Sequence, residues 1–212
     1  MSKPSLCPWF VQDQQRACST HKRTYSNIDT CVMSSVTIGR GSLRVLDYFS
    51  GKWTFCRKIV NAATNEEVGT IVAGRASFER VETSLEDTKD LLYSESGQLK
   101  MRGISSNMEV TRQYLYRCLG DMSMKVFFYN PASEEDHMRF FHNLDFVEGK
   151  DAKDTFSACA EHLCVKDLYK VQMHLENSAA FEMRWEVKGP RKNNIIVTNF
   201  TRHVVEGDGM GD

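Results

Sequence analysis

Residues 49–59, FSGKWTFCRKI, decide which fold this chain adopts. Their side chains alternate between two faces, with Trp53, Phe55, Arg57 and Ile59 on one face and Thr54, Cys56 and Lys58 on the other. Such alternation indicates a β-strand that buries one of its faces. Gly51 lets the chain turn tightly into the strand. The preceding residues 43–49, LRVLDYF, favour a short helix.

Further stretches of the same kind follow at short spacing, separated by turn signals such as NAATNEE and PASEED. The predicted strands include GTIVAGRASFERV, LLYSESGQLKM, VTRQYLYRCL, MSMKVFFYN, HMRFFHNLDF, DLYKVQMHLE, AFEMRWEVKG and NIIVTNFTRHVV. About nine short strands favour an antiparallel sandwich or barrel. The chain lacks the alternation of strands and helices that a parallel sheet needs. A second short helix is predicted at residues 155–163, TFSACAEHL.

Two side chains favour a barrel over a sandwich. Trp53 offers a large ring at the base of a barrel, and Arg202, near the end of the last predicted strand, can lie across that ring in a cation–π contact. Together with Gly51 they resemble the G-x-W and the late Arg of lipocalins and other calycins. The predicted fold class is all-β: a lipocalin-like (calycin) antiparallel β-barrel of about 8–10 strands with one or two short helices.

A more specific resemblance covers residues 46–203. FSGKWTFCRKI, LLYSESG, TRQYLYR, RFFHNLD, HLCVKDLY, WEVKGPRKN and TRH follow, in order, signatures that are similar to those of an uncharacterised family. That family is a domain of unknown function with a lipocalin-like barrel. The resemblance therefore implies the barrel and leaves the activity open, because analogy between folds does not assign function.

Composition excludes several classes of function. The formal net charge of −1 over 212 residues gives no overall field that would recruit nucleic acid or an anionic membrane. No apolar run approaches the roughly 20 residues of a membrane-spanning helix, and phosphate-loop and common hydrolase motifs are absent. The seven cysteines are scattered and odd in number. We therefore expect a soluble protein with free thiols in a reducing, cytoplasmic compartment, of undetermined oligomeric state.

The chain divides into three predicted segments. Residues 1–42 are rich in Ser and Thr, weakly basic and without a sustained period, which favours a flexible extension. Mitochondrial import is the alternative for this segment, although Asp13 and Asp29 count against it. Residues 43–206 form the predicted barrel domain, and residues 207–212 a disordered tail.

The stretch HLCVKDLY (162–169) concentrates reactive side chains. Alternation places His162 and Cys164 together on one face of the strand, and it likewise keeps Asp167 and Tyr169 together. The two pairs share the same face only if the chain bends near Val165. Three interpretations stay open: the wall of a ligand pocket, a structural turn, or an active site. In the last, His162 and Asp167 would act as acid and base, with Tyr169 as a polar donor.

Metal and haem binding are weaker alternatives for the same region. Cys159, His162 and Cys164 give a single C-x-x-H-x-C group, with His142 as a conceivable fourth ligand, whereas a structural zinc site usually has two paired ligand groups. We therefore predict no metal. A barrel could hold haem through one axial histidine, His142 or His162, but a lone histidine on an apolar face is more often a core residue.

Arginine and tyrosine side chains suggest recognition of an anion. Arg57 shares the face of Trp53 and must be paired if it points inward, by Glu95, by Asp145 or by a carboxylate on a ligand. Arg112 and Tyr114 share another face. In WEVKGPRKN, Lys188, Arg191 and Lys192 surround a Gly-Pro turn at a predicted barrel mouth, where they would steer an acidic ligand or merely keep the loop solvated.

The leading hypothesis is a barrel that binds a small, partly apolar and anionic molecule in its interior. An enzyme on the same barrel and a packed protein-interaction module are the alternatives. The predicted ligand-binding residues are Arg57, Arg112, Tyr114, His142, His162, Asp167, Tyr169, Trp185, Lys188 and Lys192.

Overall fold

The computed structural model describes residues 44–81, 89–131, 138–149 and 155–203. All of them fall within the unit 36–212 that internal contacts define. The predicted extension (1–42) and tail (207–212) lie outside the described residues. No helix in the described part of the chain is long and apolar enough to cross a membrane.

The described strands form one antiparallel sheet with the order β6-β5-β4-β3-β2-β1-β11-β10-β9-β8-β7. The strands are β1 (Gly51–Asn61), β2 (Glu67–Val81), β3 (Lys89–Met101), β4 (Met108–Cys118), β5 (Ser123–Tyr129), β6 (Met138–Asp145), β7 (Val147–Glu148), β8 (Phe156–Cys164), β9 (Asp167–Asn177), β10 (Ala180–Gly189) and β11 (Lys192–Arg202). The pairing of β1 with β11 joins the strands that come first and last along the described part of the chain.

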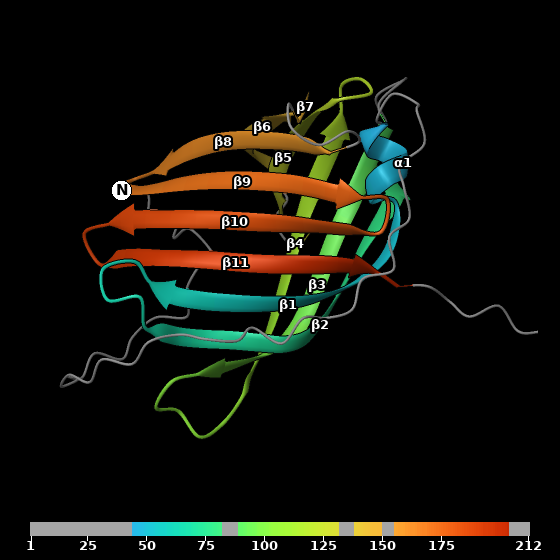
Figure 1. The fold of residues 1–212 in the computed structure, drawn as a ribbon. Coiled ribbons are helices and arrows are strands. Elements are labelled where there is room, and N and C mark those ends of the chain that lie inside the picture. The colour runs from blue at the N-terminus through green and yellow to red at the C-terminus, as the bar shows by residue number, and fades with distance from the viewer. Residues whose placement is uncertain (1–43, 82–88, 132–137, 150–154, 204–212) are drawn as a thin grey trace, which may run out of the picture. The chain divides into compact units, whose positions relative to one another are not determined.

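The sheet curls into a nearly closed barrel. In Figure 1, β8–β11 and β1 run across the front, and β3–β5 cross behind them at a steep angle. β6 and β8 approach each other at the remaining seam. There the ring of Phe141 on β6 lies 4.9 Å, centroid to centroid, from that of His162 on β8. The all-β antiparallel barrel that the sequence predicts is therefore confirmed.

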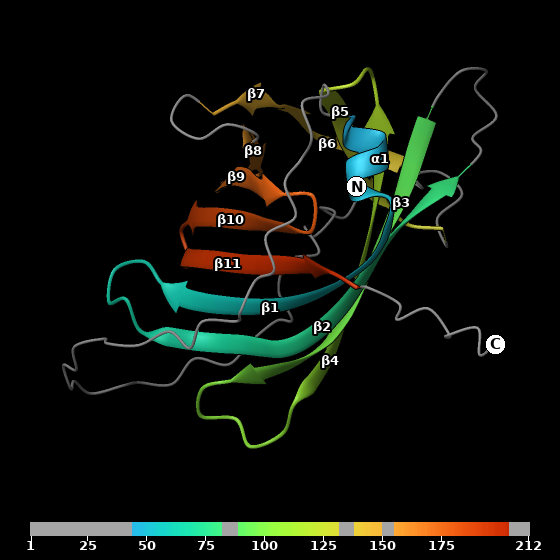
Figure 2. The ribbon, with the colours of Figure 1, turned by 45° about the vertical axis from the view of Figure 1, so that its right-hand side comes forward.

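Helix α1 (Val45–Phe49) confirms the short helix predicted before the first strand. The backbone N–H of Val45 donates to the carbonyl of Asp121, at 2.8 Å, in the turn between β4 and β5. The Tyr48 hydroxyl lies 2.8 Å from the carbonyl oxygen of Asn177 and 2.9 Å from that of Ala180, at the turn between β9 and β10. These bonds fix α1 at one end of the barrel (Figure 2).

Aromatic side chains fill the barrel beside α1. The Phe181 and Phe200 rings stack at 4.3 Å, Trp53 meets Phe181 edge-on at 4.9 Å, and Phe49 lies 5.3 Å from Phe78. All five are at most 1% exposed, so this end carries a packed core.

The base of the barrel contains the cation–π contact expected from the sequence. The Arg202 guanidinium carbon lies 4.3 Å from the centre of the Trp53 ring. The same guanidinium donates to the carbonyl oxygens of Ser50, at 2.9 Å, and Ser178, at 3.1 Å. Gly51 has a φ of +115°, a backbone conformation that residues other than glycine rarely adopt.

The predicted second helix is wrong: residues 155–163 contribute β8, which pairs with β9 from Phe156 to Cys164. HLCVKDLY is consequently two strands joined by a tight turn, and Val165 in that turn has φ +59°. The structure describes eleven strands where the sequence indicated about nine.

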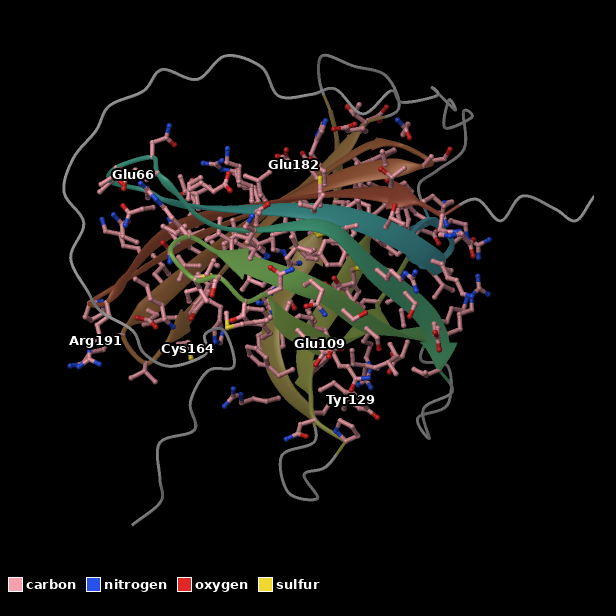
Figure 3. The ribbon with its side chains drawn as sticks, turned by 90° about the horizontal axis from the view of Figure 1, so that it is seen from below. Glu66, Glu109, Tyr129, Cys164, Glu182 and Arg191 are labelled. Carbon is pink, nitrogen blue, oxygen red and sulfur yellow. The ribbon has the colours of Figure 1, made fainter. Side chains whose placement is uncertain are left out.

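The turns β1–β2, β8–β9 and β10–β11 lie at the end of the barrel opposite α1 (Figure 1). In Figure 3, Glu66, Cys164 and Arg191, one from each turn or its flank, lie along the same side. The β3–β4 hairpin joins them, because Met101 at the end of β3 pairs with Gly69 at the start of β2. We call this the hairpin end.

Candidate functional site

A buried ion pair crosses the interior of the barrel. Arg57 on β1 donates two hydrogen bonds to Glu95 on β3, at 2.7 and 2.6 Å, and a third to the Thr198 hydroxyl on β11, at 2.9 Å. Arg57 is 6% exposed and Glu95 5%. The inward-facing arginine predicted from alternation therefore finds its partner within the protein, and Glu95 is that partner.

Burial alone would raise the pKa of Glu95. The charge and hydrogen bonds of Arg57 outweigh burial, with help from Arg112 and from the Tyr93 hydroxyl, which donates to the carboxylate. The pKa of Glu95 accordingly falls to about 2. The pair is thus charged at neutral pH inside an aromatic core, an arrangement whose desolvation cost is large.

Arg112 and Tyr114 continue this network along β4. The Arg112 guanidinium lies 3.7 Å from Glu95, and its side chain is 23% exposed against 3% for Glu95. Tyr114 is buried, its ring stacks between those of Tyr93 and Phe141, and burial raises the pKa of its hydroxyl. The hydroxyl therefore remains protonated at physiological pH and able to donate.

A second polar cluster ties the turns of the hairpin end together. Lys192 on β11 bonds to the carboxylate of Asp167 at 2.7 Å and donates to the Tyr169 hydroxyl at 2.9 Å. Burial would lower the pKa of Lys192, but its hydrogen bonds to Asp167 and Tyr169 raise it. Gly189 lies beneath this cluster, because a Cβ there would sit 1.9 Å from the Asp167 carboxylate oxygen. HLCVKDLY and WEVKGPRKN thus meet in this cluster.

The turn at Val165 brings the two halves of HLCVKDLY onto one face. His162 pairs with Tyr169, and Cys164 with Asp167, directly across the β8–β9 ladder. Yet Asp167 bonds to Lys192, and the His162 ring hydrogen-bonds to the backbone of Phe141. Among the described contacts of these two side chains, none joins His162 to Asp167, so the acid–base pair of the enzyme hypothesis is not assembled.

His142 and Trp185 occupy the interior beside the seam. Trp185 on β10 stacks on Phe141 at 5.5 Å, and the His142 ring meets Trp185 edge-on at 5.6 Å. Burial, the largest effect, lowers the pKa of His142 to about 4. His142 is therefore a neutral core residue at physiological pH.

Lys188 and Arg191 lie apart from the interior. Both side chains are exposed, and Lys188 follows the buried Val187 on the opposite face of β10. The structure thus brings together Arg57, Arg112 and Tyr114, and separately Asp167, Tyr169 and Lys192. It places His142, His162 and Trp185 at the seam.

The described cysteines differ in whether they are free thiols. Cys56, Cys118 and Cys159 are free thiols, whereas Cys164 is disulfide-bonded, so the expectation of free thiols is wrong at that position. Cys159 is exposed, and it lies on the face of β8 opposite to His162, since the two residues are an odd number of positions apart along the strand. The described residues contain no group of three or more His, Cys, Asp or Glu that could hold a metal ion.

Tyr93, Thr198 and Gly74 are parts of the site that sequence reasoning missed. Gly74 on β2 makes room for the Phe55 ring, since a Cβ there would lie 2.2 Å from it. Tyr93 belonged to the predicted strand LLYSESGQLKM, where alternation with Glu95 would have placed both inside. Thr198 carries no comparable signal, because its role depends on the β1–β11 register.

A separate recess lies at the α1 end. It has a volume of about 180 Å³ and is lined by Arg44, Val45, Leu46, Lys89, Cys118, Leu119, Gly120 and Asp121. None of the residues predicted from the sequence to bind a ligand lines it.

The fold and site define a nearly closed antiparallel barrel with charged groups in its interior. Residues 49–202 match the model of the family of unknown function DUF6314, and the chain belongs to that family. No curated protein matches it.

A solved structure with a similar fold is the S-type phycobiliprotein lyase CPES from Guillardia theta. The TM-score is 0.53 at 9% sequence identity, over 76% of this chain and 92% of the lyase. At this identity the likeness establishes the fold alone.

Proposed function

We propose that the barrel binds a small, partly apolar, anionic molecule in its interior, toward the hairpin end. The observation that carries this proposal is the charged network of Arg57, Glu95 and Arg112 within an aromatic interior. A buried ion pair is often no more stabilising than apolar side chains of similar volume. The cost of burying these charges makes stability a weak reason for the network and supports a binding role.

The balance of charge supports an anionic ligand. Of the described ionic groups around this region, four are cationic, on Arg57, Arg112, Arg139 and Lys192. Glu95 pairs with Arg57 and Arg112, and Asp167 pairs with Lys192. Few but well-placed polar groups among aromatic walls are typical of small-molecule sites.

The likeness to a phycobiliprotein lyase is compatible with such a site and names no ligand for this chain. The acid–base alternative gains no support, because the carboxylate of Asp167 is engaged by Lys192. If the barrel is instead a packed interaction module, no small molecule should stabilise the chain by binding in the barrel interior.

The test is a thermal-unfolding screen of the full chain with compounds that share one carbon skeleton and differ only in the head group. We expect carboxylates to raise Tm as their concentration increases. The free energy of unfolding should rise by about 2.7 kcal/mol at a hundredfold excess of ligand over Kd. Matched alcohols and quaternary amines should raise it far less. Equal shifts for the amine, or no shift with any anion, would reject the proposal and favour the packed module.

A further inference from the structure

Two aliphatic side chains at the hairpin end are exposed to solvent. Leu163, near the end of β8, is 67% exposed, and Val165, in the turn that follows, is 77% exposed. Both remain exposed although Cys164 between them is disulfide-bonded. Val165 also has a φ of +59°, which is rare for a β-branched residue and strains the backbone. The fold therefore holds an aliphatic tip in solvent in spite of local strain.

Basic side chains surround this tip, because the β8–β9 turn with its flanks (163–167) lies beside the β10–β11 turn with its flanks (188–192). The 2.7 Å bond between Lys192 and Asp167 joins the two turns, and Arg191 and Cys164 lie near each other in Figure 3. The charged residues of the two segments are Lys166, Asp167, Lys188, Arg191 and Lys192. The single carboxylate among them is engaged by Lys192, so the segments are strongly basic.

The remaining three cations have no acidic partner in the described part of the chain. Lys166, Lys188 and Arg191 are all exposed, and none of them forms an ion pair with a described residue. The neighbouring β1–β2 turn differs, because its Glu66 pairs with Arg102 at 3.3 Å. Three uncompensated positive charges therefore stand beside the aliphatic tip.

The sign of the charge reverses one row farther from the rim. On the outer face of the barrel, Leu163 pairs with Leu168, and Leu168 pairs with Lys188. The next row on this face has two carboxylates and one ammonium group: Glu161, Lys170 and Glu186. An anionic surface is therefore attracted to the end of the barrel and not to its side.

We propose that the hairpin end docks end-on on an anionic lipid bilayer. Leu163 and Val165 enter the interfacial region, and Lys166, Lys188 and Arg191 lie against acidic head groups. The net charge of −1 over the whole chain does not prevent docking, because attraction to a surface acts within a Debye length of about 8 Å at physiological salt. This docking surface does not depend on the ligand proposed above.

The shape of the tip favours a bilayer over a folded protein or a nucleic acid. The β8–β9 turn consists of only Val165 and Lys166, and a fluid interface accommodates such a narrow protrusion without a matching pocket. Exposed apolar side chains mark interaction surfaces. Nucleic acids are instead bound by aromatic side chains on which bases stack, and this tip is aliphatic.

Flotation of the full chain with lipid vesicles tests the docking. Vesicles of phosphatidylcholine alone are compared with vesicles of equal parts phosphatidylcholine and phosphatidylserine. The protein should bind the mixed vesicles, and added salt should weaken the binding because it screens exposed charges. Equal binding to both kinds of vesicle, or no binding to the mixed vesicles, would overturn the proposal. In the second case, binding to a soluble polyglutamate peptide would assign the tip to an acidic protein.

Charge variants locate the docking surface. Lys166→Gln/Arg191→Gln should weaken binding to the mixed vesicles by about twenty-five-fold, since each basic side chain near an anionic surface contributes about fivefold. Lys52→Gln/Arg75→Gln is the matched control, because it removes the same two charges from exposed positions on β1 and β2. An equal loss in the two double variants would refute the hairpin end as the docking surface.

Val165→Asn separates docking from folding. Asparagine adopts a positive φ more readily than valine, so the variant should unfold at the same urea concentration or a higher one. Its affinity for the mixed vesicles should fall by about fivefold to tenfold, because the tip loses apolar surface that enters the bilayer. Val72→Asn is the control, since Val72 is 80% exposed on β2. Unchanged affinity in Val165→Asn, or an equal loss in Val72→Asn, would contradict insertion of the tip.

Discussion

The carboxylate of Asp167 occupies the space that a side chain at Gly189 would need. A Cβ on Gly189 would lie 1.9 Å from the carboxylate oxygen and 3.2 Å from the Asp167 Cα, and the backbone cannot yield as a flexible side chain would. This close passage lets Asp167 reach Lys192 at 2.7 Å. It joins the start of β9 to the β10–β11 turn.

Gly189→Ala should therefore destabilise the chain by about 1–3 kcal/mol, as overpacking does, with the loss of the Asp167–Lys192 bond added. Urea unfolding measures the change. Gly120→Ala is the matched control, because a Cβ there meets nothing within 4 Å. If both variants are equally stable, Asp167 is not held against Gly189.

The Arg57–Glu95 pair predicts strong coupling between two substitutions. Glu95→Gln leaves a buried guanidinium without its counter-charge and should cost about 3–5 kcal/mol. Arg57→Met should cost a similar amount. The double variant Arg57→Met/Glu95→Met should be less destabilised than the sum of the single changes, since neither charge remains alone. Additive losses in urea unfolding would contradict the pairing.

His142 should make the chain sensitive to mild acid. Its pKa is about 4 in the fold against an ordinary 6.5. The unfolded chain therefore takes up a proton first as the pH falls. The resulting stabilisation is present in full above pH 6.5 and is lost as the pH falls toward 4. The loss is on the order of 3 kcal/mol.

His142→Gln should flatten the fall in unfolding free energy between pH 6.5 and 4. Some slope should remain, since burial also lowers the pKa of His162. His174→Gln, at an exposed position on β9, should retain the full slope. An unchanged slope in His142→Gln would show that its imidazole is not buried.

Arg202 should resist replacement by lysine. Its guanidinium donates to the carbonyls of Ser50 and Ser178 while lying over Trp53. A lysine keeps the charge but loses the planar fork that makes these contacts together. Arg202→Lys should lower stability by about 1–3 kcal/mol. Lys52→Arg, at an exposed position next to Trp53, provides a control for general effects of exchanging the two residue types.

Alternation predicted the barrel because most strands contrast strongly between their faces. On β10, Phe181, Met183 and Trp185 are buried and separated by less buried Glu182 and Arg184. β8 lacks this contrast, since small residues such as Ala158 and Ala160 supply its inward face. Residues 155–163 were consequently predicted to be helical.

The candidate site was likewise predictable from the sequence only in part. The physical need to pair a buried cation pointed to Glu95 as a partner of Arg57. The same reasoning proposed Asp145, which is exposed and accepts a hydrogen bond from Ser123 at 2.5 Å. The Asp167–Lys192 bond was not predictable, since it depends on the β8–β9 turn and on the register of β10 with β11. No local pattern specifies those pairings.

The seam between β6 and β8 has a consequence for how the protein behaves in a crowded solution. Two strand edges that could recruit strands from other chains face each other, with Phe141 and His162 in contact between them. Exposed edges are common starting points for aggregation. The ring of Phe128 also meets His162 across this seam. Substitutions that loosen these side-chain contacts should therefore expose both edges to other chains and promote self-association.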